Sequence, residues 1–141
     1  MYKLCKTEQS SQRQQRLEKG LLELMSQKSY DEISVSNLCE YLQIPRKSFY
    51  RYFSSKDGAL HALLDHTLLR FESYVPQHLR NEPHTPHREL TYFFLFWIEH
   101  KELLDALAKS GMSGALVERA MGQAITEYNL PNRPQTRRWC W

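Results

Sequence analysis

Residues 34–57 read SVSNLCEYLQIPRKSFYRYFSSKD and contain two short helical patterns with a turn between them. In the first pattern, apolar side chains recur at the i, i+3, i+4 and i+7 spacing of one helical face. They are Val35, Leu38, Cys39 and Leu42. Ser34 precedes them, and its hydroxyl can cap the free N–H groups of the first turn. Pro45 disfavours helical angles at Ile44 and suits the first position of a new helix. We therefore predict a second helix that starts at Pro45.

The predicted second helix has one packed side and one free side. Phe49, Tyr52 and Phe53 point roughly one way and indicate the packed side. The free side spans an arc of roughly 140° at about 100° per residue. It carries Arg46, Lys47, Tyr50 and Arg51. A helix in the major groove of DNA needs cations for phosphates, long donors for base edges, and hydroxyl or aromatic groups that set its register. The pattern is typical of a helix-turn-helix that reads double-stranded DNA.

One helix is predicted before this pair and another after it. Apolar residues at helical spacing indicate a helix from about residue 13 to residue 26: Leu17, Leu21, Leu24 and Met25. Tyr30 follows, and we expect it to reach back into the core, the alternative being an ordinary exposed tyrosine. Ser54 and Asp57 have the spacing of a capping box that opens the next helix. Lys56, at the positive end of that helix, is placed for a backbone phosphate. We expect Pro76 to end the helix.

Over about residues 13–60 the chain resembles the TetR family of transcriptional regulators. The matching features are the first amphipathic helix, the aromatic Tyr30, the block SFYRYF at residues 48–53, and Ser55 with Lys56 at the start of the fourth helix. Spacing and residue type agree throughout. The resemblance implies an all-α fold, in which a three-helix head is linked by a fourth helix to a helical regulatory body.

The resemblance also implies a set of DNA contacts. Residues expected to touch phosphates are Ser34, Ser48, Tyr52 and Lys56. Tyr50 and Arg51 would lie against the backbone or base edges, and Arg46 and Lys47 would face bases. Pro45 stands where the family often has a serine cap, and Lys47 stands where it often has glycine. The base-reading end of this helix is therefore expected to be more basic than usual and less able to approach DNA closely.

Composition indicates a folded, mostly helical protein of 141 residues, with 41% hydrophobic residues and a net charge of +3. This mild charge does not by itself suggest nucleic acid, so the prediction depends on the local clustering of cations. The three cysteines are far apart and lack metal-ligand spacing, and Cys39 is expected in the core. The longest apolar run, residues 92–98, is too short to span a bilayer. We expect a soluble, cytoplasmic protein without a cofactor.

The second half of the chain predicts a small helical body. Residues 77–88 contain His78, His84 and His87 between prolines, and we interpret them as a solvated loop rather than a metal site. A helix predicted from about residue 88 to 109 has a broad apolar face: Leu90, Phe93, Phe94, Trp97, Ile98, Leu104 and Leu107. This face is either ordinary core or, as the resemblance implies, the lining of a cavity for an apolar or aromatic ligand. The wall of that cavity would be Tyr92, Phe93 and Trp97.

A last helix is predicted from residue 112 to 128, after a break at Ser110 and Gly111. Its expected inward face comprises Leu116, Val117, Ala120, Met121, Ala124 and Ile125. We expect residues 1–56 to form the DNA-binding domain, 57–128 the regulatory domain and 129–141 an irregular tail. The resemblance implies two further helices that commonly form the dimer interface, and we expect them to be absent after residue 128. Dimerisation is therefore expected to need another surface, and apolar faces are expected to be left uncovered.

The leading interpretation is a repressor that binds a near-palindromic operator as a homodimer and is released by a small ligand. The alternative is a helical protein-interaction module with a vestigial DNA-binding head. An enzyme is not expected, because the sequence has no nucleophile-and-base arrangement at workable spacing and no glycine-rich phosphate loop. His61, Asp65 and His66 are neighbours on the fourth helix and are interpreted as solvent-side pairs without a role.

Overall fold

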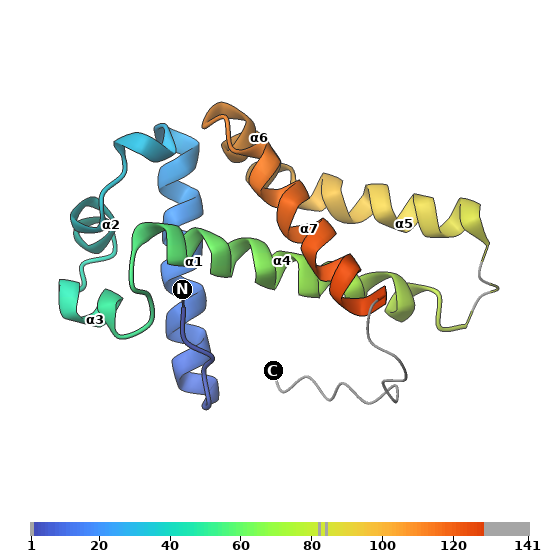
Figure 1. Ribbon diagram of the computed structural model, residues 1–141, viewed down its shortest axis with the longest axis horizontal. Coiled ribbons are helices and arrows are strands. Elements are labelled where there is room, and N and C mark those ends of the chain that lie inside the picture. Colours follow the sequence, from blue (N-terminus) through green and yellow to red (C-terminus); the bar gives the residue numbers. More distant parts are fainter. Residues whose placement is uncertain (1, 82, 84, 129–141) are drawn as a thin grey trace.

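The protein is described by a computed structural model that covers residues 2–81, 83 and 85–128, the last six of them by backbone alone. Within these residues the fold is all-α, with a short 3₁₀ turn at Tyr30–Glu32. The α-helices are α1 (Glu8–Gln27), α2 (Val35–Tyr41), α3 (Arg46–Tyr50), α4 (Lys56–His78), α5 (Pro86–Glu99), α6 (Lys101–Lys109) and α7 (Ser113–Tyr128). The predicted arrangement is confirmed: a helix-turn-helix head, a long α4 and a helical body (Figure 1).

Side-chain caps explain where several helices begin. Ser34 caps α2 as predicted: its Oγ accepts from the Asn37 N–H at 3.0 Å, and Asn37 Oδ1 accepts in return from the Ser34 N–H. Thr7 caps α1, which therefore begins several residues before the predicted start. The prediction for α4 is wrong by one residue. Ser55, not Ser54, caps it by accepting from the Gly58 N–H, and the Asp57 carboxylate instead accepts from the Tyr30 hydroxyl.

The turn of the helix-turn-helix depends on one left-handed residue. Gln43 has φ +53°, and the next amide, that of Ile44, donates to the Cys39 carbonyl at 2.9 Å. Pro45 follows with φ −65° and ψ 144°. Because this ψ is extended, Pro45 caps α3 from outside and the helix begins at Arg46, one residue later than predicted.

Two expectations about the later helices are wrong. Pro76 lies inside α4, which ends at His78. A proline this close to the C-terminus of a helix disrupts few of its backbone hydrogen bonds. The Leu79 N–H still donates to the Val75 carbonyl at 3.0 Å. The single helix expected from residue 88 to 109 is two helices, because the backbone leaves helical geometry at His100 (φ −101°, ψ 23°). The predicted break after α6 is confirmed, with Gly111 at φ +67°.

Among the described residues, a hydrophobic core cluster runs from the head into the body. Its members come from α1, α2, α3, α4 and α6, and include Leu21, Phe49, Leu60 and Leu107. Tyr30 belongs to it at 4% exposure, so the prediction that it reaches back into the core is confirmed. Helices α1 and α2 approach closely at Gly20, where a Cβ atom would lie 2.8 Å from the Leu42 side chain. The boundary expected at residue 56 remains a prediction, since the core continues across it.

The elements are arranged around α1 and α4 (Figure 1). Helix α4 runs from the head through the body, and α5 and α7 pack against it, while α6 packs against α1. The Tyr30 N–H donates to Ser110 Oγ at 3.0 Å, and Lys109 Nζ donates to the Ser26 carbonyl at 3.2 Å. These bonds attach the head directly to the end of α6. Among the described helices, none has the length and apolar character that crossing a membrane requires.

Candidate nucleic-acid interface

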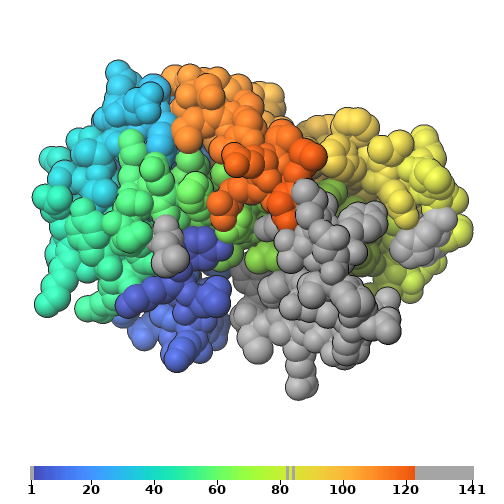
Figure 2. Space-filling model, in the orientation of Figure 1, coloured from blue at the N-terminus to red at the C-terminus, as the bar shows by residue number. Residues whose placement is uncertain are grey.

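Helix α3 presents its cationic side to solvent. The side chains of Arg46, Lys47 and Arg51 are exposed, and Tyr50 is 48% exposed. Within the described part of the chain, the three cations make no ion pair. Behind them Phe49 is fully buried, with ring contacts to Phe53 and Tyr50 at centroid distances of 5.3 and 5.4 Å. The packed aromatic side therefore holds the cationic side outward, and the head occupies one end of the molecule (Figure 2).

The residues expected at phosphates lie in different environments. Ser34 is exposed at the start of α2, Ser48 is half-buried, and Tyr52 is buried, with 8% of its surface exposed. Lys56 is half-buried; its Nζ donates to the Tyr30 carbonyl at 2.9 Å and lies 4.0 Å from the centre of the Tyr30 ring. Its ammonium therefore also supports the fold. Pro45 is exposed at the start of α3.

Buried polar groups make the head rigid behind this surface. The Tyr30 hydroxyl donates to Asp57 Oδ1 at 2.5 Å, and burial together with this carboxylate raises the pKa of Tyr30 well above its usual range. Cys39 lies in the core as expected, where burial raises the pKa of its thiol. Both groups are therefore neutral at physiological pH and fill structural positions.

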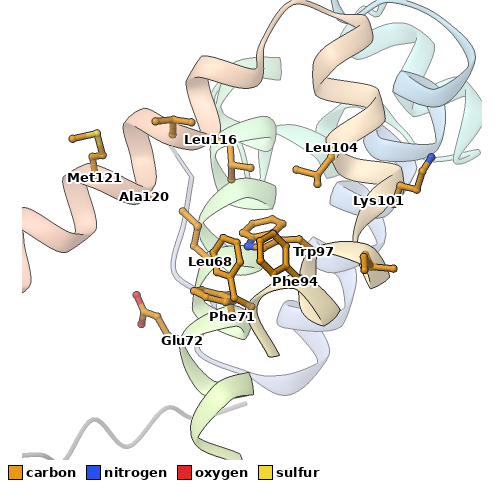
Figure 3. A pocket seen from close by; sticks show the side chains of 13 residues that line it. Leu68, Phe71, Glu72, Phe94, Trp97, Lys101, Leu104, Leu116, Ala120 and Met121 are labelled. Atoms are coloured by element: carbon orange, nitrogen blue, oxygen red, sulfur yellow. The ribbon is translucent and has the colours of Figure 1, made fainter. Parts of the chain in front are cut away.

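A second candidate site is an open apolar groove of about 810 Å³ in the body (Figure 3). Helices α4, α5, α6 and α7 supply its lining, which includes Leu68, Phe71, Phe93, Phe94, Trp97, Leu104, Leu116, Val117 and Met121. Glu72 and Lys101 are the charged residues at it. The size and apolar character are those of small-molecule sites. Sequence reasoning did not find Phe71 or Leu116, because the groove forms only where α4 and α7 meet α5.

The placement of the expected wall differs from the sequence-based expectation. Phe93 and Trp97 line the groove, but Tyr92 does not; its ring lies 6.3 Å from Tyr74 and 5.1 Å from His78, centre to centre. The inward orientation expected for α7 is wrong at Val117 and Met121, which are 58% and 60% exposed. Helices α5 and α7 face each other across an open groove, so their apolar sides are not closed into a core. Ala124, Ile125 and the tail at 129–141 lie outside the described residues and side chains.

The interpretation of Asp65 and His66 as pairs without a role is wrong. Glu18, only 2% exposed, lies 2.9 Å from His66 Nδ1. Asp65 accepts two bonds from the Arg119 guanidinium, each 2.5 Å long, and one from the Tyr2 hydroxyl at 2.7 Å. The bonds to Asp65 raise the pKa of Arg119, and burial with the Asp65 bond raises that of Tyr2. The sequence signal was weak: one acidic position, Glu18, on the apolar side of α1.

The backbone around Tyr2 pairs with the segment that follows α3. Tyr2 forms an isolated bridge with Phe53, and the Lys3 N–H donates to the Tyr52 carbonyl at 3.0 Å. Gln14 Nε2 donates to the Lys3 carbonyl from α1 at 3.2 Å. The segment at residues 2–5 thus connects the end of α3 to α4 and α7.

The described residues contain no group of three His, Cys, Asp or Glu side chains able to hold a metal ion. His78 Nδ1 lies 2.8 Å from the Tyr74 carbonyl, and His87 is exposed. His84, the third histidine of this segment, lies outside the described residues.

Comparison with known proteins agrees with this geometry. The head and α4 together are a helix-turn-helix unit, and residues 19–63 match the family model described as bacterial regulatory proteins of the tetR family. A curated relative from Bacillus subtilis (strain 168), described as the uncharacterized HTH-type transcriptional regulator YuxN, is 30% identical over 95 residues. The match covers 64% of this chain and 32% of that protein, so the chain spans about a third of the relative it matches.

The N-terminal head of this chain is therefore similar to bacterial regulatory proteins of the tetR family.

Proposed function

We propose that the protein is a DNA-binding transcriptional regulator that inserts α3 into the major groove. The observation that carries this proposal is the outward cationic side of α3, held by the fully buried Phe49 in a head that matches the tetR family model. Arg46 and Lys47 are the base-reading residues, and Tyr50 and Arg51 contact the backbone or base edges. Ser34, Ser48, Tyr52 and Lys56 contact phosphates. Pro45 directs the start of the helix.

The finer proposal is a repressor that acts as a homodimer on a near-palindromic operator. Two α3 helices in successive major grooves require half-sites about one helical turn apart, roughly 34–36 Å. The exposed apolar side chains of the body, such as Leu90, Phe94 and Ile98, support association of two chains.

The groove lined by Phe93 and Trp97 is the proposed site of a small apolar or aromatic ligand that releases the operator. A physical route supports this coupling. Helix α7 lines the groove with Leu116 and holds Asp65 with Arg119. Asp65 also binds Tyr2, whose backbone pairs with Phe53 at the end of the recognition helix. A ligand that shifts α7 therefore pulls on the segment that supports α3.

The test is selection of binding sequences from a randomised duplex library with the purified chain, followed by titration in the presence of competitor DNA. A regulator enriches a motif and binds it at least about a thousand-fold more tightly than random duplex. Arg46→Ala or Lys47→Ala should then cost about 1–3 kcal/mol and relax base preference. Arg80→Ala, which removes an exposed arginine beyond α4, is the matched control.

The alternative, a protein-interaction module, is favoured by the exposed apolar groove. It predicts no enriched motif and only weak duplex binding that salt abolishes steeply. That result would remove the regulator proposal.

A further inference from the structure

A second cationic feature lies in the head beside the recognition helix. A cleft of about 200 Å³ separates α1 from the helix-turn-helix, and its cationic lining comprises Arg13, Arg16 and Arg51. None of the described residues that line it is acidic. We propose that this cleft binds a phosphate diester of duplex DNA, so that α1 becomes part of the DNA-binding surface. The inference rests on the proposed function and adds Arg13 and Arg16 to its contacts.

The three guanidinium groups are available to an anion. The side chains of Arg13 and Arg51 are exposed and make no ion pair or hydrogen bond within the described residues. Arg16 is exposed as well, and its Nη2 donates to the Leu42 carbonyl at 3.4 Å, which keeps the guanidinium beside the turn of the helix-turn-helix. Like charges that share one cleft repel, and an anion between them removes that repulsion. An arginine also matches the geometry of phosphate with two parallel donors.

The remaining walls suit the same ligand. Ser48 contributes a half-buried hydroxyl, and the floor consists of Tyr52 with Leu17, Leu42 and Ile44. An apolar floor lowers the local dielectric constant and strengthens attraction between an arginine and an anion. The volume admits a phosphate group with a few waters, since one water occupies about 30 Å³ in the liquid.

The position favours DNA over a free anion. Ser48 and Arg51 belong to the same short segment as Arg46 and Lys47, so an anion in the cleft lies directly beside the recognition surface. A helix in the major groove is flanked by backbone phosphates, and contacts to them set the register of the protein on the duplex. Arg13 and Arg16, three residues apart on α1, thereby clamp a phosphate from the side opposite α3.

The test is the salt dependence of binding to a fluorescently labelled duplex of mixed sequence, measured by anisotropy. Each phosphate contact contributes about 0.9 to the slope of log K against log salt concentration. Arg13→Ala and Arg16→Ala should each reduce the slope by about this amount and weaken binding equally on all duplexes. Arg13→Lys, which keeps the charge, should retain the wild-type slope. Arg80→Ala is the control for loss of one positive charge, and its slope should be unchanged.

Inorganic phosphate at constant ionic strength distinguishes the two sources of the anion. If the cleft binds duplex DNA, millimolar phosphate does not saturate it. If the cleft binds free phosphate instead, millimolar phosphate saturates it, and the slope measured for Arg13→Ala equals that of wild type. Arg16→Ala loses the Leu42 bond and can lower the melting temperature. Arg13→Ala loses no side-chain hydrogen bond or ion pair within the described residues and is therefore the decisive variant.

The outcomes separate this inference from the proposed function. Loss of binding in Arg46→Ala, with wild-type affinity and slope in Arg13→Ala and Arg16→Ala, overturns the cleft and leaves the regulator proposal intact. A wild-type chain that binds no duplex at any salt concentration overturns both.

Discussion

At the scale of single residues, Gln43 shows the clearest backbone strain. Its φ of +53° places a side chain in the left-handed region, which costs an L-residue roughly 1–2 kcal/mol. The turn needs this geometry because Ile44 must reach back to the Cys39 carbonyl. The spacing of α2 and α3 is thus maintained at the expense of local stability.

Gln43→Gly should therefore stabilise the protein, by about 0.5–1 kcal/mol once the greater freedom of glycine in the unfolded chain is subtracted. Gln43→Val should destabilise it, because a β-branched side chain tolerates positive φ poorly. Urea denaturation with an unchanged m value provides the measurement. A Gln43→Gly midpoint at or below that of wild type would show that the turn is not strained.

Tyr30 joins its 3₁₀ turn to α4 and to the end of α6: its side-chain hydroxyl bonds Asp57, its backbone carbonyl bonds Lys56 and its backbone amide bonds Ser110. Tyr30→Phe should cost about 1–2 kcal/mol at neutral pH, because the hydroxyl bonds a carboxylate that remains partly exposed.

The cost should depend on pH in a defined direction. The folded-state pKa of Tyr30 lies above its ordinary value of 10.0, so the tyrosine of the unfolded chain ionises first as pH rises. The contribution of the hydroxyl to the free energy of unfolding is therefore complete below pH 10.0 and is lost as pH rises further. The gap between wild type and Tyr30→Phe should narrow by about 1.4 kcal/mol per pH unit there. Chemical denaturation at about pH 8 and about pH 11 measures it. A constant gap would show that the hydroxyl is not held neutral.

Paired polar groups connect helices in addition to the shared hydrophobic core. Arg119 of α7 is 29% exposed and Asp65 of α4 is 13% exposed in their ion pair. Removal of one partner leaves the other partly buried without compensation, which is more damaging than removal of both.

Arg119→Ala should cost on the order of 2 kcal/mol, less than a fully buried pair because water reaches the guanidinium. The double variant Arg119→Ala/Asp65→Ala should lose less than the sum of the two single variants. Thermal unfolding of the four proteins gives the coupling energy. Strict additivity would indicate that the two side chains do not stabilise each other.

The same elements show how far sequence reasoning extends. Ser34 as the cap of α2 and Cys39 in the core follow from patterns within a few residues, and the structure has both. The start of α4 was misplaced because two serines compete for the cap and Tyr30, far away in sequence, takes the carboxylate of Asp57. Pro76 does not end α4, since a proline in the last turn of a helix disrupts few of its backbone hydrogen bonds.

At the scale of the whole molecule, the helical body exposes a large apolar surface around its groove. Phe94, Ile98 and Met121 are 59%, 67% and 60% exposed around the open groove. A surface of this kind attracts a ligand or another protein.

An apolar dye such as anilinonaphthalene sulfonate should therefore bind the groove of the folded protein and gain fluorescence. Val117→Glu, at an exposed lining position, should reduce dye affinity roughly ten-fold, since a carboxylate in an apolar site costs more than about 1.4 kcal/mol. Val117→Leu keeps the lining apolar and is the matched control. Equal dye binding in all three proteins would place the dye elsewhere.

The amino-acid sequence by itself determined the helix-turn-helix, its cationic free side and its resemblance to the tetR family. These depend on local spacing, caps and a proline, and such signals act within one or two helical turns. Tertiary packing alone determined the groove, the arginine cleft and the Tyr2–Asp65–Arg119 contacts. Each of these joins side chains from elements far apart in the chain. Their meeting depends on how whole helices cross and pack, which no periodic pattern within a single helix specifies.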